Sequence, residues 1–260
     1  MRKLSEACEQ IAGTTKKLEK TAIVADYLKS RKPQDAAVAA LFLSGRPFPV
    51  WEETTLQVGG ALLWRTLSAL SGKTEQELTA AYRHHGDLGA VAAEVLPARA
   101  GGSDLKPMEV QERFRQIALA RGPAAKGALV RELLSQVTPL EAKYIIKTMT
   151  GDLRIGLKES LVEEAITKAF GGTLAEVQRA NMLLGDIGET LKLAIAGNLA
   201  GARMRLFHPL GFMLASPAES AEEALSYFEN AAVEDKYDGI RAQENQNPNL
   251  KISRYKSYSL

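Results

Sequence analysis

The chain has few of the residues that build disulfides and zinc sites. Its 260 residues contain one cysteine, Cys8, and three histidines. A single cysteine excludes an internal disulfide, and no cysteine and histidine spacing typical of a zinc site occurs. From this scarcity of cysteine we expect a reducing compartment and place the protein in the cytoplasm.

Long apolar runs and an excess of charge of one sign are also missing. No window approaches the roughly 18 uncharged apolar residues of a membrane span, and residues 1–9 contain acids where a signal peptide would be apolar. The 33 Lys and Arg residues against 31 Asp and Glu give a formal charge of +2. Bulk charge therefore neither requires nor excludes nucleic acid, and only local clusters of cations could indicate it.

Alternating β-branched segments are absent from about residue 1 to residue 200, where apolar residues recur at helical spacing between Gly, Pro, Ser and Thr. Residues 160–170 show this clearly, with one apolar face and one charged face. The pattern predicts a mainly α fold, with a compact multi-helix domain over residues 1–204. We expect helices at residues 4–11, 16–30, 33–44, 58–71, 74–84, 87–96, 107–120, 124–136, 139–149, 160–170, 174–182 and 187–196.

The character of the sequence changes after Leu206, so we expect a second domain over residues 205–260. Two prolines frame an apolar stretch, a helix is expected near 219–228, and residues 231–235 indicate a short strand. Residues 244–249 are polar and rich in turn formers. The basic segment 250–260 fits either a second strand after a hairpin turn or an unstructured end.

Segment 234–241, Glu-Asp-Lys-Tyr-Asp-Gly-Ile-Arg, places one lysine between acids and ahead of an arginine. An amine attacks phosphorus only when it is deprotonated, and a lysine with a pKa of about 10.4 is almost wholly protonated at neutral pH. The neighbouring carboxylates stabilise the ammonium, so Lys236 would need metal ions or arginines from elsewhere to react. Composition alone favours a charged surface turn.

The same segment resembles the nucleotidyltransferase motif of ATP-dependent DNA ligases, Glu-x-Lys-Tyr-Asp-Gly-x-Arg, at all six fixed positions. Residues 212–215, Phe-Met-Leu-Ala, resemble the family's Pro-Met-Leu-Ala entry to the adenylation domain. Segments 42–49, 86–89 and 150–157 resemble signatures of the ligases' N-terminal DNA-binding domain. The resemblance covers about residues 1–243 and implies an incomplete α+β nucleotidyltransferase segment after the helical domain.

This resemblance implies an enzyme that seals nicks in duplex DNA, with ATP and Mg²⁺ as cofactors. Lys236 would attack the α-phosphate of ATP and become the lysyl-adenylate. Glu234 would lie against the adenine, and Arg241 would contact the ribose or the nicked strand. Ser253-Arg254 matches the start of the next family motif but comes about three residues early, so Arg254 is a further candidate ATP-binding residue. We expect a monomer that binds nicked double-stranded DNA independently of sequence.

The family's later motifs, with the acids that organise metal, and its oligonucleotide-binding-fold domain do not occur in these 260 residues. No metal ligand is therefore assigned, and we expect the chain alone to be a poor or null ligase. Three functions stay open. They are the DNA-binding front portion of an ATP-dependent ligase, a non-catalytic module for nicked DNA, and a helical interaction protein with a coincidental lysine turn.

Two loops of the helical part carry the groups that bind DNA phosphates. Thr14-Thr15-Lys16-Lys17 opens an expected helix with two hydroxyls and two cations, and residues 151–156 set Arg154 between glycines. The alternative is that the threonines only cap the helix and that Arg154 pairs with Asp152. The family resemblance favours phosphate contacts by Thr15, Lys16 and Arg154.

The histidine pair and the bulky aromatic residues are expected to have structural roles and not to bind a metal or take part in catalysis. His84 and His85 are adjacent on an expected helix and cannot both face one metal well, so they indicate a helix end. We expect the other bulky aromatic residues to pack in the core or between helices. These are Phe42, Phe48, Trp51 and Trp64.

Overall fold

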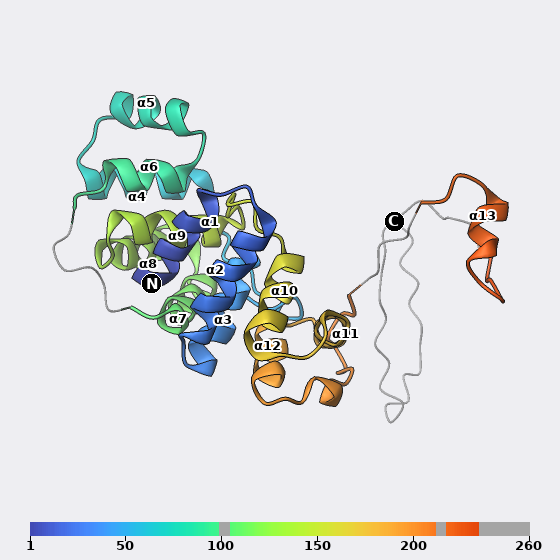
Figure 1. Cartoon of the computed structure of the whole chain (residues 1–260). Coiled ribbons are helices and arrows are strands. Elements are labelled where there is room, and N and C mark those ends of the chain that lie inside the picture. Colours follow the sequence, from blue (N-terminus) through green and yellow to red (C-terminus); the bar gives the residue numbers. More distant parts are fainter. Residues whose placement is uncertain (99–104, 212–216, 234–260) are drawn as a thin grey trace, which may run out of the picture.

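The computed structural model describes residues 1–98, 105–211 and 217–233. Within these ranges the chain forms thirteen α-helices, one short 3₁₀ helix and no strand (Figure 1). The expected mainly α fold is confirmed. Each of the twelve helices expected between residues 4 and 196 is present, with ends within two residues of the expected ones.

The helix bounds are α1 Arg2–Ala12, α2 Lys17–Lys29, α3 Pro33–Leu43, α4 Gly60–Ser71, α5 Glu75–His85, α6 Leu88–Val95, α7 Pro107–Leu119, α8 Gly122–Ser135, α9 Pro139–Thr150, α10 Glu159–Phe170, α11 Leu174–Leu184, α12 Ile187–Ile195, η1 Leu199–Gly201 and α13 Ala221–Ser226.

Short-range capping fixes where several of these helices begin. The hydroxyls of Thr74, Thr138 and Thr173 each accept a hydrogen bond from the backbone N–H three residues on, and the carboxylate of the glutamate at that position accepts one from the backbone N–H of the threonine. This reciprocal capping box satisfies backbone N–H groups that a helix start leaves unpaired. The signal lies wholly in the local sequence, which is why these helix starts are predictable.

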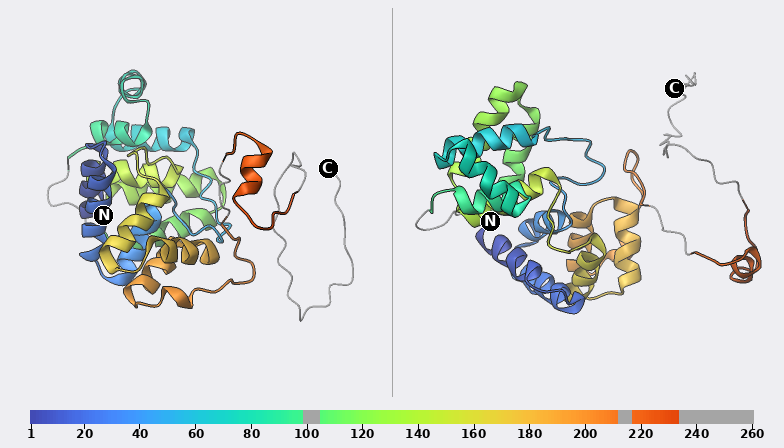
Figure 2. Two further views of the ribbon diagram at one scale, coloured as in Figure 1. Left: turned by 45° about the vertical axis from the view of Figure 1, so that its right-hand side comes forward. Right: turned by 90° about the horizontal axis from the view of Figure 1, so that it is seen from above.

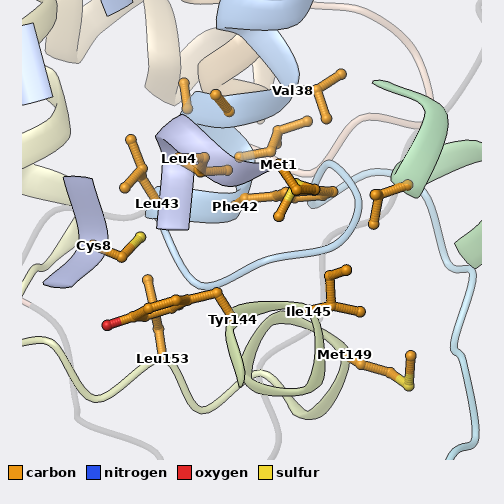
Figure 3. Packing of buried hydrophobic residues seen from close by; sticks show 14 of the residues in the cluster. Met1, Leu4, Cys8, Val38, Phe42, Leu43, Tyr144, Ile145, Met149 and Leu153 are labelled. Carbon is orange, nitrogen blue, oxygen red and sulfur yellow. The ribbon is translucent and has the colours of Figure 1, made fainter. Parts of the chain in front are cut away.

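The helices pack in two groups that share one hydrophobic core. Helices α4 to α9 contact one another in one group, and α2, α3, α10, α11 and α12 form the other. Helix α1 contacts both α2 and α9, and α3 contacts α7, so the two groups are joined (Figure 2). At the junction, Leu4, Phe42 and Leu43 face Tyr144 and Ile145 of α9 (Figure 3).

Residues 205–211, called the strap below, follow the expected domain boundary but pack on the helical part. The Gly211 N–H donates to the Met182 carbonyl at 3.0 Å. The His208 ring stacks on Trp51 with centroids 4.7 Å apart, and its Nδ1 lies 3.1 Å from the Leu184 carbonyl. These contacts tie the strap to the end of α11 and to the loop after α3.

Helix α13 is shorter than the helix expected at 219–228, and none of its residues is buried. Of the strand expected at 231–235, the structure describes residues 231–233, and these do not form a strand. The expected division into domains 1–204 and 205–260 stays a prediction.

Candidate nucleic-acid interface

The site residues inferred from the sequence divide into two sets. Glu234, Lys236, Arg241 and Arg254 lie outside the described residues, as does segment 212–215. The three candidates for DNA contact, Thr15, Lys16 and Arg154, lie within them. The structure therefore bears on the DNA-binding candidates and not on the ATP-binding ones.

Thr15 and Lys16 lie exposed at the start of α2. The neighbouring Thr14 closes the turn: its Oγ1 accepts from the Lys16 N–H at 3.2 Å and donates to Glu19 at 2.7 Å. In the described part of the chain, the side chains of Thr15 and Lys16 form no hydrogen bond. The N-cap residue of α2 is Lys16, and no side chain caps this helix, so the capping role left open for the threonines is not observed. Thr15 and Lys16 are available to a ligand.

Arg154 lies in the loop 151–158, which joins α9 to α10. Leu153 and Ile155 on either side of it are buried and anchor the loop, so the arginine between them points to solvent. Its guanidinium forms a two-point pair with Asp152, with Nε 2.8 Å from Oδ1 and Nη2 2.7 Å from Oδ2. The pairing alternative is therefore present, and the arginine side chain is still 60% exposed.

The loop 151–158 is fastened to α2 by Lys20, whose Nζ donates to the carbonyls of Ile155 at 2.6 Å and Gly156 at 3.1 Å. The turn after α3 adjoins the same loop, because a Cβ on Gly151 would lie 3.9 Å from the Gly45 carbonyl oxygen. Arg46 of this turn also lies 3.7 Å from Glu159, the first residue of α10. The start of α2, this turn and the loop are therefore neighbours, although they are distant in sequence.

These three segments expose more cations than acids. Segments 14–19, 44–47 and 151–159 contain five basic and three acidic residues. The basic ones are Lys16, Lys17, Arg46, Arg154 and Lys158, and all five are exposed. Such a cluster on a chain of nearly balanced charge is the local signal that binding to phosphates requires.

Segment 86–89 has a different role. Asp87 caps α6 by accepting from the Ala90 N–H at 2.8 Å, and it forms an ion pair with Lys147 of α9. A Cβ on Gly89 would lie 2.6 Å from the Lys143 carbonyl oxygen. This segment therefore serves the close crossing of α6 and α9.

Segment 42–49 also serves packing. The Phe42 ring lies 5.7 Å from that of Phe114, and the Arg115 guanidinium lies 5.3 Å from the centre of Phe48. Phe42 and Phe48 are buried, as expected. Trp51 differs from the expectation, since it is 36% exposed and lies beside the strap.

The remaining titratable candidates show no assembled site. His84 and His85 end α5, as expected. Burial raises the pKa of the Cys8 thiol, which keeps it protonated and unreactive. Among the described residues, no three His, Cys, Asp or Glu side chains lie together so that they could hold a metal ion.

Two residues of the interface were not predicted from the sequence. Lys20, in Lys-Lys-Leu-Glu-Lys, has the appearance of a solvated surface lysine, and its carbonyl partners lie 135 and 136 residues away. Arg46 lies within a segment that resembled a family signature, but no role was assigned to it. A separate signal for either residue is absent from the local sequence.

Comparison with known proteins shows the family of the chain. Residues 1–167 match the family model described as DNA ligase N terminus. The chain belongs to the DNA ligase family. It is 61% identical over 244 residues to a probable DNA ligase of Koribacter versatilis, covering 94% of this chain and 42% of that protein. It is 35% identical over 252 residues to a DNA ligase of Methanopyrus kandleri, covering 92% and 45%.

The chain spans less than half the length of these curated DNA ligases. The matched range contains the whole interface, including Lys16, Lys20, Arg46 and Arg154, and it ends before segment 234–241. Membership of the DNA ligase family contradicts the alternative of an unrelated helical interaction protein. The described residues include no helix long and apolar enough to cross a membrane.

Proposed function

We propose that this chain is the DNA-binding portion of an ATP-dependent DNA ligase and that it binds nicked duplex DNA without regard to sequence. The observation that carries the proposal is the exposed set of five cations on three adjoining segments. In this proposal residues 1–204 form the DNA-binding domain, and residues 205–260 begin the adenylation domain.

The chemistry of the surface suits phosphate and not base edges. Lys16 and Arg154 supply charge, and Thr15 supplies a hydroxyl donor. Contacts of this kind release counterions from the duplex and carry no sequence information. A protein that must accept any nick needs binding of this type, and a monomer suffices for it.

The proposal for catalysis rests on the sequence motif alone. The Nζ of Lys236, once deprotonated, attacks the α-phosphorus of ATP, a phosphoramidate bond forms, and pyrophosphate leaves. Glu234, Arg241 and Arg254 are proposed to hold the nucleotide, and Mg²⁺ would offset the charge of the phosphates. No residue is assigned as a ligand of that metal.

The binding proposal is tested with Arg154→Ala and Lys16→Ala in the 260-residue chain. Each variant loses one phosphate contact, so we expect about tenfold weaker binding at 0.1 M salt and a salt slope smaller by about one. Fluorescence anisotropy on two nicked duplexes of unrelated sequence measures both quantities, and the loss is expected to be equal on the two duplexes.

Arg113→Ala is the matched control, since Arg113 also pairs with a carboxylate, Glu132, at 2.7 Å, but lies on α7. Its affinity for DNA is expected to stay unchanged. Unchanged affinity of both Arg154→Ala and Lys16→Ala at low salt would remove these loops from the interface.

Catalysis by the 260 residues alone is tested by incubation with labelled ATP and Mg²⁺, followed by intact-mass measurement. We expect little or no AMP adduct, in agreement with either a ligase portion or a non-catalytic module for nicked DNA. A stoichiometric AMP adduct on Lys236 contradicts the expected inactivity and favours the ligase over the module.

A further inference from the structure

Lys20 is a buried lysine whose ammonium faces carbonyls and not a carboxylate. It is 6% exposed, and its Nζ donates to Ile155 at 2.6 Å and to Gly156 at 3.1 Å. No ion pair of Lys20 is found within the described ranges. A buried ammonium is costly unless its hydrogen bonds are made, so this lysine has a position-specific role.

The loop that Lys20 holds has a conformation that the chain would not favour unaided. Arg154 has φ of +46°, in the left-handed region that side chains other than Gly and Asn rarely enter. Gly156 has φ of +62°, and a Cβ there would lie 2.6 Å from the Lys20 Nζ. The ammonium therefore occupies the place that a side chain at 156 would take.

The same lysine joins two separate parts of the interface. Lys20 lies one turn after Lys16 on α2, and its two acceptors directly follow Arg154 in the loop. Lys20 thus links the two proposed phosphate contacts directly, beside the buried side chains of Leu153 and Ile155 that anchor the loop. Lys20 itself is too buried to reach a phosphate.

We propose that Lys20 is a positioning residue that fixes the loop 151–158 against α2, so that Arg154 and Lys16 meet the DNA backbone at a set spacing. The inference rests on the proposed DNA binding. Without the ammonium, the carbonyls of Ile155 and Gly156 lose their donor, the loop leaves α2, and Arg154 no longer reaches its phosphate.

The chain offers a matched control in Lys126 of α8. Lys126 is also 6% exposed, and its Nζ donates to a single backbone carbonyl, that of Leu56, at 2.7 Å. The two lysines share their type, burial and kind of hydrogen bond, but Lys126 does not touch the loop 151–158. If Lys20→Met loses DNA affinity and Lys126→Met does not, the loss is due to the position of the loop 151–158 and not to a general loss of stability.

The experiment measures binding of the 260-residue chain to a nicked duplex over a range of salt. For Lys20→Met we expect about tenfold weaker binding at 0.1 M salt and a slope smaller by about one, as for Arg154→Ala. The double variant Lys20→Met/Arg154→Ala is expected to bind no more weakly than either single one, because both remove the same contact.

Gly156→Ala tests whether the position of the loop matters separately from the charge of Lys20. It keeps the Lys20 ammonium and places a methyl group 2.6 Å from Nζ, so we expect the same loss of affinity and slope. It also carries the test if circular dichroism shows that Lys20→Met does not fold. If Gly156→Ala binds like the wild type, the inference is overturned.

Failure of the inference and failure of the proposed function give different results. If Arg154→Ala and Lys16→Ala both bind DNA as the wild type does, the proposed interface is wrong. If only Arg154→Ala does, Arg154 makes no phosphate contact and the positioning role of Lys20 is excluded. If Arg154→Ala binds weakly while Lys20→Met folds and binds normally, the interface stands and the positioning role of Lys20 is excluded.

Discussion

Segment 86–89 and the loop 151–158 both begin with Gly-Asp-Leu, but the ion pairs of their aspartates differ in exposure. Each follows a helix that ends at a glycine, and each contains an aspartate paired with a cation. The side chains of Asp87 and Lys147 are 12% and 8% exposed, whereas those of Asp152 and Arg154 are 48% and 60% exposed.

This difference in exposure separates a structural motif from a proposed binding motif. A buried ion pair cannot exchange its partner without leaving a charge unpaired in the interior. An exposed pair contributes little to stability, so its arginine can turn from a carboxylate to a phosphate at small cost. We therefore expect changes in segment 86–89 to affect folding and changes in the loop 151–158 to affect DNA binding.

The largest effect is expected for Asp87→Ala, which leaves Lys147 buried without its partner and removes the cap of α6. We expect the free energy of unfolding to fall by about 3–4 kcal/mol, measured by urea denaturation at pH 7. Affinity of the folded fraction for DNA should not change. A loss of DNA affinity without a loss of stability would contradict the structural role of segment 86–89.

The cost of Asp87→Ala should also depend on pH. Burial disfavours the Asp87 carboxylate, but hydrogen bonds from Lys147 and the Ala90 N–H outweigh this and lower its pKa. A carboxyl group whose pKa is lower in the folded than in the unfolded state stabilises the fold at pH values above its unfolded pKa of about 4. This stabilisation is lost as the pH falls through the pKa of the folded state. The difference in the free energy of unfolding between wild type and Asp87→Ala should therefore become smaller below a pH of about 4.

A smaller effect is expected for Gly89→Ala. Its Cβ would lie 2.6 Å from the Lys143 carbonyl oxygen, so α6 and α9 must separate, at a cost of about 2 kcal/mol. Gly127→Ala is the control within α8, where the nearest atom is 4.0 Å away, and it should stabilise by up to about 1 kcal/mol. Equal thermal midpoints for the two variants would contradict the close crossing.

The smallest change in stability is expected for Asp152→Asn. The substitution removes an exposed charge, so the free energy of unfolding should change by less than about 0.5 kcal/mol. Binding to nicked DNA should become a few times tighter at low salt, because Arg154 is released and a negative charge near the phosphate is removed. Weaker binding would mean that Asp152 orients Arg154 toward the duplex.

The helices were predictable from sequence because their signals are local. Thr138 with a glutamate three residues later marks the start of α9, and Gly151 marks its end with φ of +70°. The candidate interface was predictable only in part. Thr15, Lys16 and Arg154 lie in loops with suitable composition, and the family resemblance drew attention to them.

Contacts between distant residues could not be predicted from the sequence. Nothing in the residues around Lys20 indicates that it turns inward to carbonyls of another loop. The prediction that Trp51 packs in the core or between helices was wrong for the same reason, since its ring stacks on His208 of the strap. Both contacts depend on packing of elements that are far apart in the chain, and composition and periodicity do not report on this.

The strap also limits how far Lys236, the proposed nucleophile, can lie from the helical part. Gly211 is held at Met182, and Lys236 is the twenty-fifth residue after it. Even a fully extended chain of that length reaches only about 85 Å. In the proposed function the helical part holds nicked DNA, so Lys236 and the nick would share one tether, and their encounter would depend on an effective local concentration and not on the amount of protein in solution.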